Sequence, residues 1–380
     1  MIYLDNPATT FPKPPLLAEE ISRCIKCYCG NPGRSTHFMS MKSAERIFET
    51  RSIIAEMFSC EPENVIFTYN TTYALNIAIK SSLKPHSHIL LSDIEHNAVL
   101  RPVSALSRDG LCSYDFFCTD GTNEDILNSI HQKITDDTSM LICSHISNVG
   151  ERRLPIKEIG ELCRERGIFF IVDGAQSAGI HEISTTEMNI DALCFPAHKA
   201  LYGPQGVGVL ILNSEKSRRT IIEGGTGVAS LSLEMPDFLP ERYEAGTLST
   251  PLIAGFGESL KWLRGYNMNK IREHEEGLYN TALDLLRKNE QITVYKMNEY
   301  SGNTLMFNVK GISCAKIGYE LNRRDICVRT GFHCAPLAHK KLKTGDFGAV
   351  RIGFSLFNTQ KEVYSFYDAL IDILKKQIIA

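Results

Sequence analysis

Apolar and polar residues follow two different periods along the first two thirds of the chain. Apolar side chains recur every three or four residues over 16–28 and 41–58, as expected for helices with one buried face. Further along, short apolar runs predict strands that are buried on both faces: 65–67, 88–91, 114–117, 140–143, 168–172, 191–195 and 207–212. Helix-length segments separate most of these runs, for instance 72–82, 124–133 and 156–166. This alternation predicts an α/β fold whose mostly parallel sheet is covered by helices on both sides.

The pattern changes after about residue 250. An amphipathic stretch over 255–272 predicts a helix, and mixed strand and helix signals follow as far as Ala380. We therefore expect a large domain over 13–250 and a smaller α+β domain formed by 1–12 and 251–380.

Composition and charge exclude several classes of protein. The 380 residues are 43% hydrophobic and 22% charged, which is ordinary for a globular chain and rules out a disordered or collagen-like one. Lys and Arg number 41 against 44 Asp and Glu, with no long run of either sign, so we expect no nucleic-acid partner. No apolar stretch approaches the roughly 20 residues of a membrane span, and the N-terminus does not resemble a secretory signal. We expect a cytoplasmic protein that binds no membrane and keeps its twelve cysteines reduced.

The positions that directly follow the predicted strands carry polar side chains. Ligand sites of parallel α/β sheets lie at this edge, so these residues are candidates for chemistry. They are Thr71, Thr72, Glu95, His96, Ser147, Asn148, Asp173, Gln176, His198 and Lys199. Asp173 fits a carboxylate facing the cleft or a helix N-cap equally well. Lys199 fits a buried amine that forms Schiff bases, although most lysines are simply solvated charges.

Two further motifs have a structural as well as a functional interpretation. Thr71 and Thr72 open a predicted helix, where hydroxyls and free N–H groups either bind a phosphate or cap the helix. The glycines at 203, 206 and 208 do not form a dinucleotide-binding motif, because a strand follows them and no helix opens there.

Cysteines fall into two contrasting settings. Cys334 stands in the polar segment 328–336 beside His333 and close to Arg329, whose positive charge favours a thiolate. By contrast, the three cysteines between 24 and 29 follow a helical pattern and have no nearby histidine. We expect those three to pack, and we expect no metal site.

Taken in order, these pieces resemble the cysteine desulfurases, which are pyridoxal-phosphate (PLP) enzymes of the class V aminotransferase group, often called NifS/SufS-like. The segments that carry the resemblance are Tyr3–Asn6, Thr71–Thr72, Glu95–Asn97, Ser147–Asn148, Val172–Gln176, His198–Lys199, Glu244–Thr247, Arg329–Cys334 and Arg351. They extend over almost the whole chain. The short loop around Cys334 resembles the SufS branch, which includes the selenocysteine lyases. The resemblance implies the fold type I of PLP-dependent transferases, with a seven-stranded sheet in the large domain and the Cys334 loop and Arg351 in the small one.

The resemblance also implies roles around the cofactor. Lys199 would hold PLP as a Schiff base and then move protons, while Asp173 would keep the ring nitrogen protonated so that the ring accepts electrons. His96 would stack on the ring, and Gln176 and Asn148 would reach the ring oxygen and the substrate side.

Further residues would bind the phosphate and the substrate. The phosphate would contact Thr71, Thr72 and His198, together with Thr247 of the neighbouring subunit. Arg351 would clamp the substrate carboxylate through a fork-to-fork pairing, which lysine could not reproduce. Arg329 and Arg34, together with Asn148, would complete the substrate side.

The sequence departs from the family pattern at two places near Lys199. Pro196 stands where the family usually has a serine that adds a hydroxyl to the phosphate site. The segment from His198 to Pro204 is also one residue longer than in the SufS branch. We expect one phosphate bond fewer and a changed loop beyond Lys199.

The leading hypothesis is a cysteine desulfurase that converts L-cysteine to L-alanine and leaves a persulfide on Cys334. The alternatives are a selenocysteine lyase that acts on L-selenocysteine and a class V aminotransferase in which Cys334 has no catalytic role. A non-catalytic sulfur-relay scaffold is disfavoured. The resemblance implies a homodimer in which Thr247 and Arg34 reach the partner's site, and a small sulfur-acceptor protein. Because Gly331 and Pro336 restrict the loop, we expect the persulfide to be partly sheltered.

Overall fold

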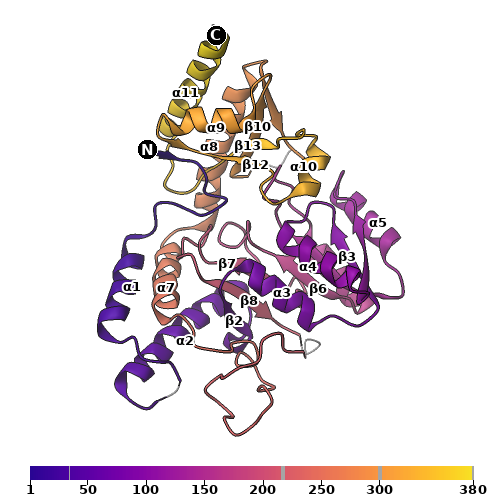
Figure 1. Cartoon of the computed structure of the whole chain (residues 1–380), viewed down its shortest axis with the longest axis vertical. Coiled ribbons are helices and arrows are strands. Elements are labelled where there is room, and N and C mark those ends of the chain that lie inside the picture. Colours follow the sequence, from indigo (N-terminus) through magenta and orange to yellow (C-terminus); the bar gives the residue numbers. More distant parts are fainter. Residues whose placement is uncertain (34, 215–218, 298–301, 379–380) are drawn as a thin grey trace.

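The computed structural model describes residues 1–33, 35–214, 219–297 and 302–378, and its centre is a seven-stranded sheet (Figure 1). The strand order is β2-β8-β7-β6-β5-β3-β4. The strands are β2 (Val65–Thr68), β3 (Ser87–Ser92), β4 (Cys112–Phe117), β5 (Thr138–Ser144), β6 (Phe169–Asp173), β7 (Ala192–Pro196) and β8 (Gly208–Leu212). Only β8 runs antiparallel to its neighbours within this sheet. The prediction of seven strands in a mostly parallel sheet is confirmed.

Alternate residues of the central strands enter two apolar cores, one on each face of the sheet. In β5, Leu141 and Cys143 belong to one core, whereas Met140 and Ile142 belong to the other. Helices α3 (Thr71–Ser81) and α4 (Asn97–Arg108) cover the second face, and α2 (Phe38–Phe58), α5 (Asn123–Lys133) and α6 (Ile156–Arg166) contribute to the first. Burial on both faces explains why these strands read as continuous apolar runs.

A second, smaller part of the chain contains a four-stranded antiparallel sheet with the order β12-β13-β10-β9. Its strands are β9 (Ile292–Tyr295), β10 (Thr304–Val309), β12 (Arg329–Gly331) and β13 (Ala349–Gly353), and its helices are α8 (Met268–Arg287), α9 (Cys314–Asn322), α10 (Pro336–Leu342) and α11 (Gln360–Ile378). The N-terminal strand β1 (Ile2–Tyr3) pairs with β11 (Ile326–Cys327), and Leu4 joins the apolar core of this part. The chain therefore begins and ends in the same lobe, at the top of Figure 1.

The stretch 255–272, predicted as one helix, contains the end of one helix and the start of another. Helix α7 (Thr250–Arg264) ends at Gly265, and α8 starts after Asn267, whose side chain accepts hydrogen bonds from the backbone N–H groups of residues 269 and 270. Helix α7 packs beside α1 (Pro15–Cys27) and α2, and its apolar side chains enter the core of the large sheet (Figure 1). We therefore propose that the division between the two parts lies after α7, near residue 265, rather than at 251.

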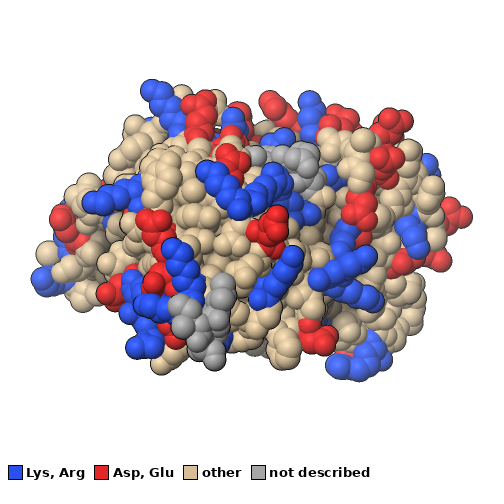
Figure 2. Space-filling view, turned by 90° about the horizontal axis from the view of Figure 1, so that it is seen from above, with Lys and Arg blue, Asp and Glu red and all other residues tan. Residues whose placement is uncertain are grey.

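Surface charges of both signs are mixed over the face of the small lobe. Figure 2 shows acidic and basic side chains interspersed across the view from that side. Among the described residues, no helix has the length and apolar character needed to cross a membrane.

Candidate active site

One cavity at the carboxyl edge of the large sheet gathers most of the residues singled out from the sequence. Its lining includes Thr71, Thr72, His96, Asn148, Asp173, Gln176, His198 and Lys199, together with Asn70, Ser144 and Pro196. They come from the ends of β2, β3, β5, β6 and β7, which the sheet topology brings to one edge.

Asp173 is the last residue of β6, and its side chain is buried. Its Oδ1 accepts a hydrogen bond from Ala175 N at 2.9 Å, which orients the carboxylate at the strand end. Burial raises the pKa of Asp173, while this hydrogen bond and the charge of Lys199 oppose the rise. The carboxylate therefore lies within electrostatic range of the lysine amine.

Lys199 follows β7 in a tight turn that closes through a hydrogen bond from Tyr202 N to Lys199 O of 2.8 Å. Tyr202 has a φ of 56°, so the turn includes one left-handed non-glycine residue. Burial lowers the pKa of Lys199 to about 8; Asp173 opposes this effect, and the positive charges of Arg351 and Arg329 add to it. The amine is thus far easier to deprotonate than an ordinary lysine.

His96 stands at the N-terminus of α4, and its ring is held by the backbone. Its Nδ1 accepts a hydrogen bond from Ala98 N at 3.0 Å. Burial lowers the pKa of His96 to about 4, and the charge of Lys199 contributes further. The ring is therefore neutral at physiological pH and presents an uncharged face to the cavity.

The N-terminus of α3 has the features of an anion site. Asn70 caps the helix by accepting a hydrogen bond from Tyr73 N at 3.0 Å, so the two threonines are not the cap. Thr71 Oγ1 and His198 Nδ1 are buried and have no hydrogen-bond partner among the described residues. Gly208 lies directly beneath this turn, where a Cβ would come within 2.4 Å of the carbonyl carbon of Asn70. Only glycine allows β8 to approach so closely.

The Cys334 loop is tied to the large domain beside this cavity. Asn97 N donates to Cys334 O at 2.8 Å, and Asn148 Nδ2 donates to His333 O at 2.9 Å. His333 and Cys334 have φ values of 50° and 58°, so two consecutive non-glycine residues hold a left-handed conformation. Cys334 is exposed. The partial sheltering expected for a persulfide on Cys334 stays a prediction, because it concerns the assembled protein.

Arg351 lies in the middle of β13 and is 1% exposed. Its Nη2 donates to Asp5 Oδ1 at 3.0 Å and its Nη1 to Asn148 O at 3.4 Å, whereas the buried Nε has no partner among the described residues. Arg329 is its register partner on β12. The two arginines add positive charge next to Lys199, as their effect on its pKa indicates.

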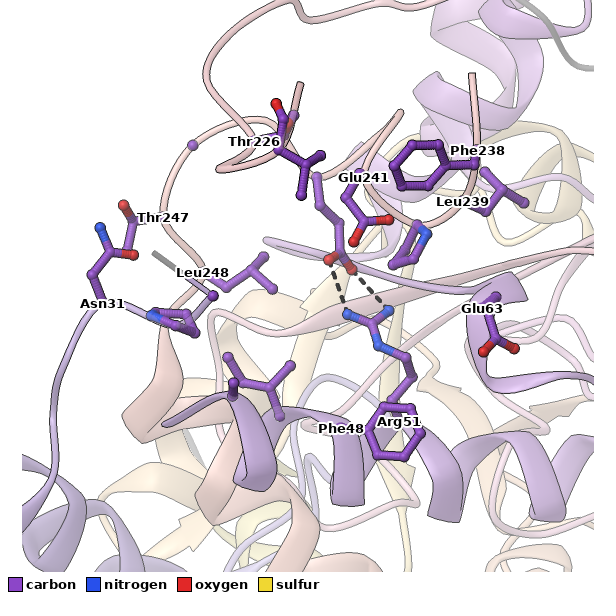
Figure 3. A pocket seen from close by; sticks show the side chains of 18 residues that line it. Asn31, Phe48, Arg51, Glu63, Thr226, Phe238, Leu239, Glu241, Thr247 and Leu248 are labelled. Carbon is purple, nitrogen blue, oxygen red and sulfur yellow. Dashed lines mark hydrogen bonds and ion pairs between the residues drawn. The ribbon is translucent and has the colours of Figure 1, made fainter. Parts of the chain in front are cut away.

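Thr247 lies apart from Lys199, in a different cavity of about 470 Å³. Figure 3 shows Thr247 close to Asn31, near a buried ion pair in which Arg51 Nη2 meets Glu244 Oε2 at 2.9 Å. Arg34 lies outside the described residues, although the neighbouring Gly33 lines this second cavity. The two segments predicted to reach a partner's site are therefore neighbours in space.

Two contacts of the site were not anticipated from the sequence. Asp5 is the ionic partner of Arg351, although only its place in the Tyr3–Asn6 segment drew attention to it. Lys13 Nζ donates to His198 O at 2.9 Å and to Thr10 Oγ1 at 2.8 Å, which fastens the N-terminal segment to the Lys199 turn. No local pattern marks either residue, because Arg351 lies 346 residues from Asp5 and His198 lies 185 residues from Lys13.

The residues present fit a phosphorylated aldehyde cofactor such as PLP. Unpartnered buried polar atoms of Thr71 and His198 line the same cavity as an amine with a lowered pKa and a buried carboxylate. Pro196 lines it too and contributes no hydroxyl, and one phosphate bond fewer stays a prediction.

The fold and this cavity define an α/β protein with a buried lysine of lowered pKa at the carboxyl edge of its sheet. The chain belongs to the aminotransferase class-V family, whose model matches residues 2–366. It is 29% identical over 388 residues to a probable cysteine desulfurase of Pyrococcus abyssi, covering 99% of this chain and 94% of the relative. It is 30% identical over 382 residues to the cysteine desulfurase IscS of Vibrio campbellii, covering 95% and 90%.

The structure is similar to the apo structure of the cysteine desulfurase from Thermococcus onnurineus. The TM-score is 0.90 at 28% sequence identity, covering 99% of this chain and 95% of that one. The predicted fold class is thereby confirmed.

Proposed function

We propose that this protein is a PLP-dependent cysteine desulfurase that transfers sulfur from L-cysteine to Cys334 and releases L-alanine. The observation that carries the proposal is the convergence of Lys199, Asp173 and the open α3 anion site in one cavity, with the Cys334 loop hydrogen-bonded to its edge. Relatives named cysteine desulfurase match nearly the whole chain, which supports the same conclusion.

Each residue of the cavity has a proposed part in holding the cofactor. Lys199 Nζ would bond covalently to it, and Asp173 would hold a proton on its ring nitrogen. Thr71, Thr72 and His198 would bind its phosphate. The bound cofactor would supply an electron sink for the substrate carbons. The neutral ring of His96 would lie against it, with Gln176 beside its oxygen.

The substrate would be oriented by the small lobe. Arg351 has a buried Nε with no partner and lies in the same lobe as the cysteine loop, so its guanidinium can pair with the substrate carboxylate. Arg329 would add positive charge on the adjacent strand, and Arg34 would approach from a neighbouring subunit. The amine of Lys199, once released from the cofactor, would move the protons.

Cys334 would act as the nucleophile. Its thiolate would attack the sulfur of the bound cysteine, so that the carbon–sulfur bond breaks and a sulfur–sulfur bond forms. The electron pair left on the substrate carbon would take up a proton, which gives alanine. Because Cys334 is exposed in the chain, we propose that a small acceptor protein collects the sulfur directly from this loop.

We propose a homodimer in which the segment near Asn31 and the segment around Thr247 complete the partner's site. Large apolar side chains are exposed beside these segments, including Phe48 at 56% and Phe238 at 50%, which line the same cavity as Asn31 and Thr247. An apolar surface of this kind is typical of an interface between subunits. Light scattering under assay conditions tests this proposal, and a fully active monomer would refute it.

The central test compares two variants with the parent enzyme. Lys199→Ala should abolish covalent capture of PLP and all turnover. Cys334→Ala should keep the absorption band of bound PLP and yet release almost no sulfide from cysteine, and mass spectrometry of the parent should locate the extra sulfur on Cys334. A protein that stays colourless with added PLP, or a Cys334→Ala variant with the parent rate of sulfide release, would contradict the proposal.

A further inference from the structure

A third cavity, with a polar lining, lies beside the loop that follows β5. It has a volume of about 430 Å³, and its lining includes His145, Arg152, Arg153, Lys157, Glu158, His181, Glu182 and Arg272. None of these residues has a part in the proposed desulfurase chemistry. The cavity therefore needs an explanation of its own.

Two buried histidines line this cavity, and we call them its histidine floor. His145 and His181 are 5% and 6% exposed, and their rings meet edge to face with centroids 5.8 Å apart. His145 Nδ1 is buried and has no hydrogen-bond partner among the residues that the structure describes. Leaving such a group unpaired is energetically costly, so a ligand that supplies the missing partner would be stabilised.

The rim of the cavity is mainly cationic. Arg153 Nη1 lies 3.5 Å from His181 Nδ1. Arg272 reaches the cavity from α8, and its positive charge helps to lower the pKa of His181. Lys157 stands in the first turn of α6, a helix whose N-terminus lines the cavity and is capped by no side chain. Positive side chains and a helix N-terminus together favour an anion.

Four cations and two carboxylates face the cavity. The cations are Arg152, Arg153, Lys157 and Arg272, and the carboxylates are Glu158 and Glu182. Arg152 is buried and donates to Gly121 O at 2.7 Å, so it contributes charge from the wall. Within the described part of the chain, no group of three or more His, Cys, Asp or Glu side chains is placed to hold a metal ion. The excess of positive charge therefore selects an anionic ligand rather than a cation.

We propose that this cavity is a binding site for a small molecule that carries a phosphate or sulfate group, and that binding is accompanied by proton uptake on the histidine floor. The oxyanion would accept hydrogen bonds from His145 and from the guanidinium groups of Arg153 and Arg272. The cavity exceeds the size of a single oxyanion, which favours an ester over the free ion. The site does not depend on the proposed desulfurase function.

The coupling to protons follows from the surroundings of the histidines. Burial, the neighbouring His181 and Arg153 lower the pKa of His145 to about 3, so it is neutral when the cavity holds no anion. Burial, Arg153 and Arg272 likewise lower the pKa of His181 to about 4. A bound dianion would supply the missing negative charge and raise both pKa values, and affinity should then increase as the pH falls.

Calorimetric titration of the PLP-loaded enzyme with sulfate tests the site, because bound PLP blocks the cofactor phosphate site and sulfate keeps its double charge over the range used. We expect saturable binding that is about tenfold tighter near pH 5.5 than near pH 8. Arg153→Gln and Arg272→Gln should each weaken binding about tenfold, because each removes a charged donor. Arg166→Gln, which removes an exposed arginine at the far end of α6, is the matched control and should leave binding unchanged.

His145→Gln should remove most of the pH dependence. If this buried variant fails to fold, the Arg153→Gln and Arg272→Gln variants still test the site, because Arg153 is exposed and Arg272 is half-exposed. Titration with glycerol phosphate and with inorganic phosphate shows whether the site prefers an ester or the free ion. Tighter binding of the ester supports the proposal. Absence of saturable sulfate binding, equal weakening by Arg166→Gln, or an affinity that does not change with pH would overturn it.

Discussion

The lowered pKa of Lys199 predicts how the protein should capture its cofactor at different pH values. Covalent capture needs the neutral amine, and a pKa that falls from 10.5 to about 8 makes this form about 300 times more abundant at pH 7. The rate at which the cofactor-free protein captures PLP should therefore rise with pH and level off above a midpoint near 8. An ordinary lysine would show a rate that is still rising near pH 10.

A substitution at Asp173 makes the test specific. The carboxylate of Asp173 raises the pKa of Lys199, so Asp173→Asn should move the midpoint below 8, even though the variant holds the cofactor more weakly. Stopped-flow absorbance with excess PLP measures both profiles, and Lys199→Ala gives the background. PLP titrates identically in each mixture, so the difference between the two profiles belongs to the protein. A parent midpoint near 10, or an upward shift in Asp173→Asn, would refute the assignment of a buried amine beside this carboxylate.

Three further substitutions test the geometry of the site. Arg351→Lys removes the paired N–H donors with which a guanidinium group binds a carboxylate. We therefore expect kcat/KM for cysteine to fall about tenfold to a hundredfold in steady-state assays of sulfide release. Asn148→Ala leaves His333 O without its donor, so urea unfolding should show a loss of about 1–3 kcal/mol and proteolysis within residues 331–336 should accelerate. Gly208→Ala forces a Cβ against the backbone of Asn70, and we expect a loss of about 1–3 kcal/mol in unfolding free energy together with weaker PLP binding. Unchanged values for any of these variants would contradict the corresponding contact.

Local patterns in the sequence determined the large sheet and the position of its ligand-binding edge. Each of the seven apolar runs is a strand. Side chains buried on both faces of the sheet leave a continuous apolar signal, except in the edge strand β4, whose middle residues are only partly buried. Asp173, Lys199 and His96 could be found in the same way, since Asp173 ends β6, Lys199 and His96 lie three and four residues beyond the ends of β7 and β3, and parallel strands end at one edge. The break between α7 and α8 was missed, although Asn267 is a local capping signal within an otherwise amphipathic stretch.

Tertiary structure alone decided which residues from distant parts of the chain meet. Asp5 pairs with Arg351 across 346 residues, and Asn148 holds the loop of Cys334 across 185, because the N-terminal strand and the β5 loop both contact the small lobe. The exposure of Cys334 and the lowered pKa of Lys199 also depend on how the elements pack. Helical and strand periods arise from neighbours a few residues apart, whereas ion pairs, burial and the cavities between elements depend on how complete elements pack, and no local period encodes that arrangement.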